Sequence, residues 1–238
     1  MIKINKSESP RELSELREKA LQEGKSVKEA FESLRNPLKS NVTELLMKDQ
    51  GHLCAYCMRR IPDSRPTTND VPKVSIEHLY PQNPKAHDGI EGVLDFNNML
   101  AVCSGNQGDR QSKGKSRLTC DAKRGNRPLK ISPLDSSTLE TIYYTSTGRI
   151  ASADEEINRD IDQILNLNCQ VDAVRLPESR KEVLDAIQES VASMNHGEIL
   201  TYSKQILSEF ESETDPKTPY VGIIIWWLKQ FISNITSE

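Results

Sequence analysis

The sequence predicts a mostly α-helical protein with a small, metal-stapled domain in the middle of its 238 residues. Two observations support this prediction. Apolar residues recur at helical spacing in the first 50 residues and again from about residue 153 onward. Between these regions Gly, Pro and Asn are frequent, apolar runs are short, and four of the five cysteines lie between Cys54 and Cys120.

The composition is that of a globular protein. Hydrophobic residues make up 36% of the chain and charged residues 28%, which excludes a disordered or a membrane-embedded chain. The longest apolar stretch, Val221–Ile232, contains Lys229 and is shorter than the about 20 residues that span a bilayer. The first residues turn polar at once, without the apolar core of a signal peptide. We therefore expect a cytoplasmic protein.

Residues 1–50 form the first of three predicted segments, and this segment is helical. Ser9 with Glu12, and Ser26 with Glu29, have the Ser-x-x-Glu spacing of a capping box, which marks the start of a helix. Proline and glycine mark the ends. The three predicted helices run from about Pro10 to Glu23, from Ser26 to Pro37, and from Asn41 to Gly51.

Residues 136–238 form the third segment, a short β-hairpin followed by a helical domain. Thr141–Thr145 and Arg149–Ala151 flank a Ser-Thr-Gly turn, which favours a strand pair. Three stretches of helical periodicity follow, around residues 157–165, 183–191 and 200–210. The last helix, roughly Tyr220–Ile235, is apolar nearly all round, so we expect its own domain or another chain to cover it.

Residues 51–135 form the middle segment, which carries a predicted zinc site. Cys54 and Cys57 are spaced so that two thiolates can bind one zinc ion from a single turn. A thioredoxin-like redox pair would need a βαβ setting, which the predicted elements do not provide. Cys103 and Cys120 are the nearby candidates that complete a tetrahedral site, the alternative being unrelated buried thiols. Four thiolates leave no open position, so this zinc would be structural.

Two short predicted strands, Val74–Leu79 and Met99–Cys103, lie between the cysteine pairs. The first strand contains Glu77 and His78 inside an apolar run. Burial of such a pair is costly unless the two groups have partners or a function, and a histidine bonded to a backbone carbonyl is the simpler alternative. Asn98 precedes the second strand, and Asp121 directly follows the fourth cysteine.

Taken together, these motifs resemble the HNH endonucleases, whose site is a ββα-metal fold; the resemblance covers about residues 50–130. It implies that His78 is the general base, that Asn98 buttresses the loop, and that Glu77 and Asp121 hold a catalytic metal ion. The family usually has Asp where this chain has Glu77, and His or Asn where it has Asp121. Both remain hard oxygen ligands suited to Mg²⁺ or Mn²⁺.

A narrower resemblance extends along most of the chain. The signatures Cys-Ala-Tyr-Cys, Ile-Glu-His, Cys-Asp-Ala-Lys-Arg-Gly-Asn and Asn-Leu-Asn occur together at residues 54–57, 76–78, 120–126 and 166–168. In this combination they are similar to the HNH nuclease subunit of Septu-type and retron-associated anti-phage systems. The resemblance implies a role in antiviral defence and an ABC-type ATPase as partner.

Charge is distributed unevenly along the chain. Residues 104–130 contain 8 Lys and Arg against 2 Asp and Glu, whereas residues 131–238 contain 8 against 18. The basic stretch is either a solvated loop or an electrostatic footprint for nucleic acid. In the second interpretation six cations contact phosphates without reading sequence: Lys113, Lys115, Arg117, Lys123, Arg124 and Arg127.

The leading hypothesis is a metal-dependent nuclease. A neutral His78 can take a proton from water near pH 7, and a divalent ion between Glu77 and Asp121 would stabilise charge on the phosphate. The alternative is a non-catalytic zinc module that binds nucleic acid or a protein partner. Such a module would need the cysteines but not the Glu77–His78 pair or Asp121.

Overall fold

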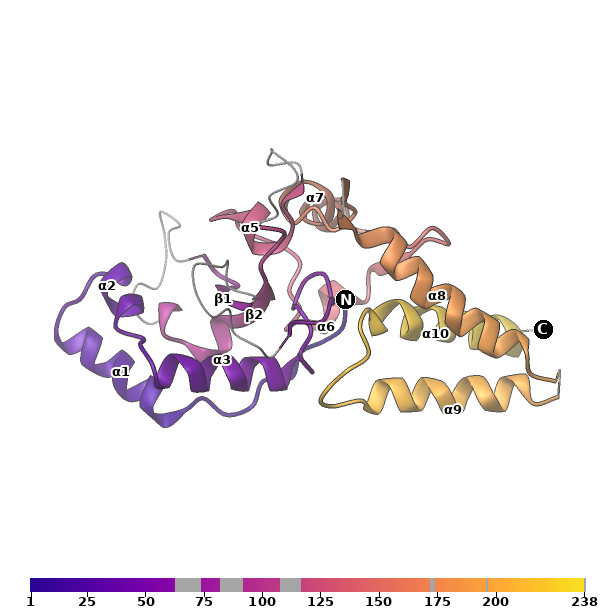
Figure 1. Cartoon of the computed structure of the whole chain (residues 1–238), viewed down its shortest axis with the longest axis horizontal. Helices are drawn as coiled ribbons and strands as arrows, with labels where there is room; N and C mark the ends of the chain where they lie inside the picture. The colour runs from indigo at the N-terminus through magenta and orange to yellow at the C-terminus, as the bar shows by residue number, and fades with distance from the viewer. Residues whose placement is uncertain (63–73, 82–91, 108–116, 172–173, 196, 238) are drawn as a thin grey trace.

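The computed structural model describes residues 1–62, 74–81, 92–107, 117–171, 174–195 and 197–237. About half of the chain is helical, and the described strands pair into small two-stranded sheets. Figure 1 shows an elongated molecule, with the first helices at one end, a centre that contains β1 and β2, and long helices at the other end. Helical regions on either side of a small central unit were predicted, and this arrangement is confirmed.

Three helices form the N-terminal end: α1 (Arg11–Gln22), α2 (Val27–Glu32) and α3 (Leu38–Asp49). The capping box at Ser26 is present, since its hydroxyl accepts from the Glu29 N–H at 3.3 Å and its own N–H donates to Glu29 at 2.9 Å. The capping box predicted at Ser9 is wrong, because Pro10 occupies the N-cap without a side-chain cap. Helix α3 begins before the predicted Asn41, directly after Pro37.

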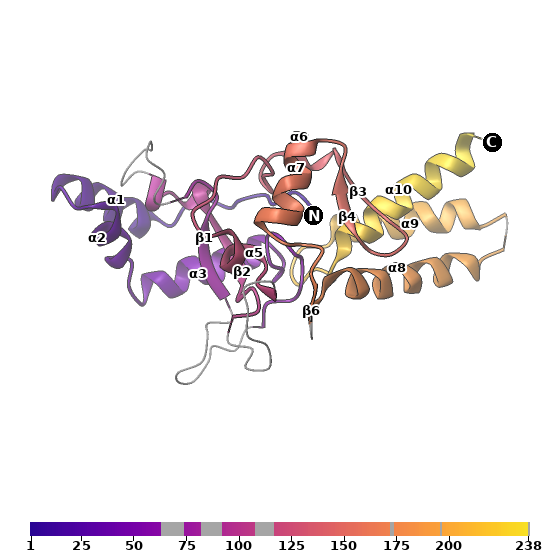
Figure 2. The ribbon, with the colours of Figure 1, turned by 90° about the horizontal axis from the view of Figure 1, so that it is seen from above.

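The centre contains β1 (Val74–His78), the short 3₁₀ helix η1 (Phe96–Asn98), β2 (Met99–Cys103) and α5 (Cys120–Arg124). The two strands are antiparallel, with His78 opposite Met99 and Glu77 opposite Leu100. All five residues of β2 are buried, since α3 and α5 both pack against this strand. Figure 2 shows β1, β2 and α5 close together in the middle of the molecule. The two strands were predicted as Val74–Leu79 and Met99–Cys103, so the first is one residue shorter than expected and the second has the predicted bounds.

The remaining chain begins with a hairpin and continues into helices. The hairpin strands, β3 (Ile142–Tyr144) and β4 (Ile150–Ser152), are the predicted pair. The other elements are α6 (Ser136–Leu139), α7 (Glu155–Arg159), the π-helix η3 (Asp160–Ile164), β5 (Gln170–Val171), β6 (Val174–Arg175), α8 (Leu176–Ala192), α9 (Ile199–Ser212) and α10 (Val221–Ser237). Helices α8, α9 and α10 pack against one another at the end of the molecule.

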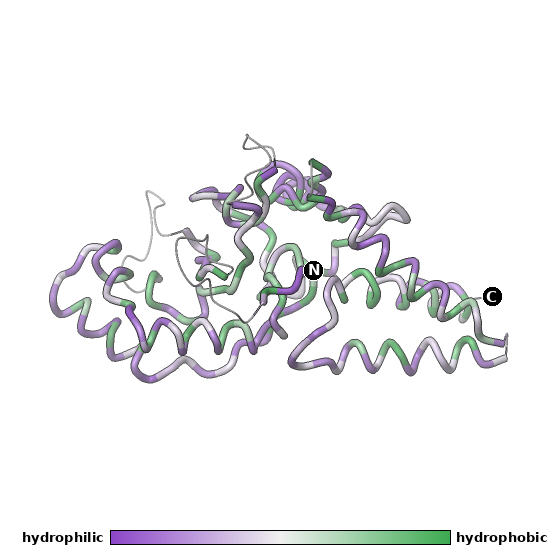
Figure 3. Tube along the Cα trace, viewed as in Figure 1, coloured by the Kyte–Doolittle hydropathy of each residue, from purple (hydrophilic) through white to green (hydrophobic). Residues whose placement is uncertain are grey.

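Helix α10 is predominantly apolar, as its green colour in Figure 3 shows. Its first turns are buried, including Val221 and Ile223, whereas Trp226 and Trp227 are half-buried. The Trp227 ring stacks on Phe231 with 4.8 Å between the ring centroids. The helix is therefore covered along its first half and only partly covered along its second. Within the described residues, no helix has the length and apolar character needed to cross a membrane.

The three predicted segments share one hydrophobic core, which runs from the first residues to Leu228. Backbone hydrogen bonds also join them. The donors and acceptors are Ile4 N and Pro133 O (2.8 Å), Lys217 N and Gly51 O (3.0 Å), Tyr220 N and Met58 O (3.0 Å), and Cys120 N and Leu165 O (2.8 Å). The centre of the chain is thus packed against both flanking regions.

Candidate functional site

The four cysteines of the predicted metal site lie together in the core. Their sulfur atoms are all within 4.8 Å of one another, and none forms a disulfide. The closest Sγ–Sγ distances are 3.7 Å for Cys57–Cys103, 3.8 Å for Cys54–Cys120 and 3.9 Å for Cys103–Cys120. A tetrahedral zinc ion with Zn–S bonds of about 2.3 Å places its thiolates about 3.8 Å apart. The cluster can therefore hold a metal ion such as zinc.

The chain around the second cysteine pair is held by a close backbone contact. Gly105 has a φ of +58°, and a Cβ at this position would lie 2.2 Å from the Thr119 carbonyl oxygen. Only glycine fits here, and its carbonyl accepts a 3.0 Å hydrogen bond from the Thr119 N–H. The Asn106 amide adds a 3.0 Å hydrogen bond to the Arg117 carbonyl. These contacts bring Cys103 and Cys120 together despite their separation in the sequence.

A half-buried cation, Arg59, lies beside the four sulfurs. Arg59 donates to the Asn106 side chain at 2.9 Å. Burial alone would lower the pKa of Arg59, but the thiolates of the cysteine cluster raise it by more, so the guanidinium stays charged. Four thiolates around Zn²⁺ have a net charge of −2. Arg59 is therefore placed to offset part of the negative charge of a loaded site.

Glu77 and His78 at the end of β1 meet Asp121 at the start of α5. We call Glu77, His78, Asp121 and the nearby Arg124 the carboxylate–histidine cluster. The Asp121 carboxyl lies within hydrogen-bonding reach of Glu77 and acts electrostatically on His78 as well. Burial raises the pKa of Glu77 to about 8, with Arg124 opposing the rise and Asp121 adding to it. The fold thus brings together the three residues that the sequence analysis chose as general base and metal ligands.

His78 is buried, with 4% of its surface exposed. Its Nε2 lies 2.9 Å from the Val93 carbonyl oxygen, so Nε2 donates and the lone pair of the neutral ring is on Nδ1. The Phe31 ring of α2 packs nearly perpendicular to the imidazole, with 5.1 Å between centroids. Burial lowers the pKa of His78, which keeps it neutral at pH 7. The carbonyl bond named as the simpler alternative is present, and it also fixes the tautomer that a general base would need.

The Asn98 side chain joins two parts of the chain, Tyr80 just after β1 and Gly92. Its Oδ1 accepts from the Tyr80 N–H at 2.7 Å, and its Nδ2 donates to the carbonyls of Tyr80 (3.2 Å) and Gly92 (2.9 Å). The side chain is buried, so these bonds are made in a setting where they are difficult to replace. Asn98 is therefore placed as the buttress that the family resemblance implies.

The prediction for Arg124 is wrong. This residue was expected to contact phosphate at the surface, yet only 2% of it is exposed. Its guanidinium forms an ion pair with Glu77 and donates to the carbonyls of His78 at 2.9 Å and Leu79 at 2.6 Å. The hydroxyl of Tyr56 completes the group, donating to Glu77 at 3.2 Å. Arg124 is thus a core residue that holds the end of β1.

Of the other five residues that were predicted to contact nucleic acid, the three that the structure describes differ in how exposed they are. Arg127 is exposed, but its guanidinium donates to backbone carbonyls of Arg124 (3.0 Å), Gln163 (3.2 Å) and Ile164 (3.1 Å), so it also connects α5 to η3. Arg117 and Lys123 are half-buried. Lys113 and Lys115 lie outside the described residues.

Three features of the site were not predicted. Tyr56 lies inside the Cys-x-x-Cys turn and supports Glu77, although nothing in its spacing signals this contact. Phe31, which packs on His78, also lines a cavity of about 440 Å³ beside Arg35 and Lys39. Two exposed cations are therefore next to the ring that covers the histidine. Their proximity depends on how α2 packs on β1, which a one-dimensional charge count does not capture.

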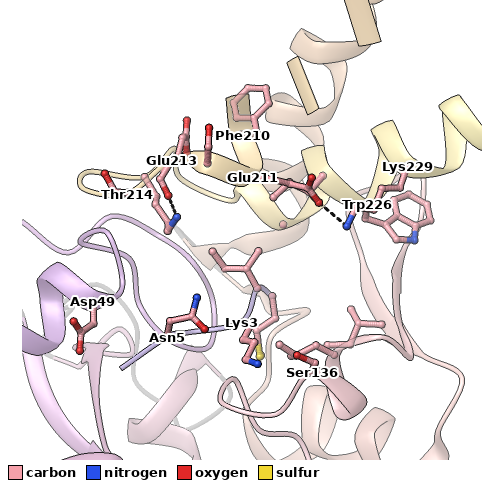
Figure 4. Close-up of a pocket in the computed structure, with 18 of the residues that line it drawn as sticks. Lys3, Asn5, Asp49, Ser136, Phe210, Glu211, Glu213, Thr214, Trp226 and Lys229 are labelled. Carbon is pink, nitrogen blue, oxygen red and sulfur yellow. Dashed lines mark hydrogen bonds and ion pairs between the residues drawn. The ribbon is translucent and has the colours of Figure 1, made fainter. Parts of the chain in front are cut away.

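A larger cavity of about 1180 Å³ lies elsewhere, between the first residues of the chain and the α9–α10 connection (Figure 4). Trp226 lines it, and the 2.7 Å ion pair between Lys229 and Glu211 borders it. No residue of the cysteine cluster or of the carboxylate–histidine cluster lines this cavity. The larger of these two cavities is therefore not at the predicted site.

Comparisons with known proteins do not assign a family. No protein-family model matches the chain, and no curated protein matches it. The function is therefore inferred from the residues of the two clusters and from their geometry.

The Arg124–Glu77 ion pair leads to a stability prediction. Arg124→Met is expected to lower the free energy of unfolding by about 1–3 kcal/mol, because it leaves buried acceptors on Glu77 and on the His78 and Leu79 carbonyls without their donor. Adding Glu77→Gln to this variant should restore part of the loss. Urea unfolding of the single and double variants measures both effects. Lys123→Met, one position earlier on α5, is the control, and an equal loss in that variant would contradict the prediction.

Proposed function

We propose that this protein is a metal-dependent HNH endonuclease that hydrolyses phosphodiester bonds of nucleic acid. The observation that supports this function is the convergence of Glu77 and His78 with Asp121, next to four clustered cysteines. A zinc-stapled ββα-metal unit requires this combination, and a purely structural zinc knuckle does not require the Glu77–His78–Asp121 group.

In this proposal the zinc ion is structural. Cys54, Cys57, Cys103 and Cys120 all act as ligands, which leaves no open position for water or substrate. The zinc site fixes β2 relative to α5, since Cys103 ends the strand and Cys120 begins the helix. Asp121 then reaches Glu77 because it is adjacent to a metal ligand.

The carboxylates of Glu77 and Asp121 suit a hard divalent cation, Mg²⁺ or Mn²⁺. Tyr56 and Arg124 both contact Oε1 of Glu77, so Oε2 is the oxygen of Glu77 that would hold such an ion. When bound, the ion supplies positive charge to the phosphate and to the leaving oxygen. His78 takes the proton of the attacking water at Nδ1, and the Val93 carbonyl holds the opposite nitrogen in place. Asn98 keeps this part of the chain from shifting.

The second candidate is a non-catalytic zinc module that binds nucleic acid or a protein. One observation favours it: His78 is buried, and Glu77 is already paired with a buried arginine. In that case His78 and Glu77 would only stabilise the folded core. The two candidates differ in one measurable property, which is cleavage that depends on a divalent ion.

The resemblance to Septu-type and retron-associated nucleases adds a proposed role as the effector of an anti-phage complex with an ABC-type ATPase. The half-buried Trp227 and Phe231 of α10 offer an apolar surface to such a partner. The acidic balance of residues 131–238 makes this part of the chain a poor surface for nucleic acid and leaves it for protein contacts.

The decisive experiment is a cleavage assay. The purified full chain, alone and with the ATPase, is incubated with labelled DNA and RNA, with Mg²⁺ or Mn²⁺ and without either. We expect cleavage only with a divalent ion, and we expect Asp121→Asn to need a higher ion concentration because it removes a charged ligand. Zinc content is measured in parallel as the control for folding. Cleavage by Asp121→Asn with unchanged ion dependence would contradict the assignment of Asp121.

A further inference from the structure

Tyr80 is the most exposed large apolar side chain in the described part of the chain. Its exposed fraction is 63%, against 43% for Leu21 and for Tyr143. Tyr80 lies directly after β1, two residues beyond His78. Two residues of extended chain span at most about 7 Å. The Cα atom of Tyr80 therefore lies within one nucleotide step of the Cα atom of His78.

The backbone that carries this exposed ring is held by hydrogen bonds from several residues. The buried Asn98 side chain bonds both the N–H of Tyr80 (2.7 Å) and its carbonyl (3.2 Å). The preceding residue, Leu79, donates its N–H to the Asn98 carbonyl at 2.9 Å and accepts from Arg124 at 2.6 Å. An aromatic ring on a fixed backbone loses little conformational freedom when a ligand stacks on it.

Basic residues follow in the sequence of α5 and just after it, although the one that contacts this part of the chain, Arg124, is buried and paired with Glu77. Arg124 bonds Leu79, and Arg127 donates to the Arg124 carbonyl from the end of α5. Lys123 precedes Arg124 on the same helix, and Arg127 is exposed. The exposed ring is therefore the feature that points to a ligand here, because aromatic side chains bind single-stranded nucleic acid by stacking on the π-face that every base has.

We propose that Tyr80 is a stacking platform for an unpaired base next to the scissile phosphate, and that the substrate is single-stranded nucleic acid. The proposal rests on the nuclease function above and adds the substrate class to it. In a duplex the base beside the scissile phosphate is stacked and paired, so its face is not available to the ring. Unstacking such a base costs free energy that a single strand does not require.

The test measures binding by the full-length His78→Ala protein, which leaves the nucleic acid uncut. The probes are a short labelled DNA strand, its RNA counterpart, the same DNA annealed to its complement, and a strand of the same length with abasic sites. Tyr80→Ala is expected to weaken single-strand binding by about 5-fold to 100-fold. Tyr80→Phe, which keeps the ring, should bind like its parent. Tyr143→Ala, an equally simple change on β3, is the matched control and should have no effect.

The abasic strand separates stacking from a general structural effect. It keeps the phosphates, so the loss caused by Tyr80→Ala should vanish on it if the ring acts on bases. A loss that persists on the abasic strand, or duplex binding as tight as single-strand binding, would overturn the proposal. Tyr80-dependent binding without cleavage by the unmodified protein would refute the nuclease function but not the stacking platform. Cleavage and binding unaffected by Tyr80→Ala would refute the platform alone.

Discussion

A Cys103→Ser protein is expected to lose its zinc and to unfold in the centre of the chain. Zinc binding to four thiolates contributes an apparent free energy of about 10–16 kcal/mol, which equals or exceeds the entire stability of a typical domain. Serine offers no thiolate, and the three remaining sulfurs would be left in the core without the ion that offsets their charge. Within the described residues, the regular elements of the middle segment are all short: β1, η1, β2 and α5.

Metal analysis and thermal unfolding measure this result. Cys169→Ser is the matched control, because Cys169 is also a buried free cysteine but lies outside the cluster. Its sulfur lies 3.9 Å from the Arg117 carbonyl, a contact that a serine hydroxyl can replace. We expect this control to keep its zinc and most of its stability. A Cys103→Ser protein that is folded and retains full zinc would contradict the assignment of the ligands.

The second large effect is expected from His78→Ala. If His78 takes the proton of the attacking water, its removal should lower the cleavage rate by about 10²–10⁴-fold. The Val93 carbonyl would lose its partner, so a stability cost of about 1–3 kcal/mol is expected as well. The rate is therefore measured well below the unfolding temperature, with zinc content recorded for each sample.

His52→Ala is the control for this experiment. His52 is close to Cys54 in sequence, but its ring faces Asp215 at 3.3 Å rather than the carboxylate–histidine cluster. Its replacement should leave the cleavage rate within a few-fold of the original protein. Undiminished cleavage by His78→Ala would refute the proposed mechanism. Zinc-loaded, folded protein without any cleavage, in the presence of the ATPase and divalent ions, would favour the non-catalytic module.

The elements that the sequence predicted well have strong local signals. Ser26 and Glu29 form their capping box because both partners lie within one helical turn. The Glu77–His78 strand pairs with β2 because the two apolar runs have the length and spacing of strands. The four cysteines converge, as the hypothesis of one tetrahedral site predicted. In each case the information lies within a few residues or in one chemical requirement.

The unpredicted features depend on packing between distant segments. Six cations of the basic stretch look alike in sequence, and only the packing of α5 on β1 buries Arg124 against Glu77. The π-helix η3 follows α7 without any change in apolar spacing. Strands of two residues, β5 and β6, are too short to show a period. Pro10 takes the N-cap that Ser9 was expected to occupy, a shift of one residue that periodicity does not resolve.

The hydrogen bond from the Tyr220 N–H to the Met58 carbonyl has a consequence for the order in which the protein is made. Ribosomes add residues from the N-terminus, so Cys54 and Cys57 leave the tunnel long before Tyr220 does. Likewise, the Cys120 N–H cannot form its hydrogen bond until the Leu165 carbonyl has been synthesised. A nascent chain therefore has the cysteines and the carboxylate–histidine cluster before it has the contacts that brace them. The full geometry of the site is completed late in synthesis, when α10 emerges and packs against the centre.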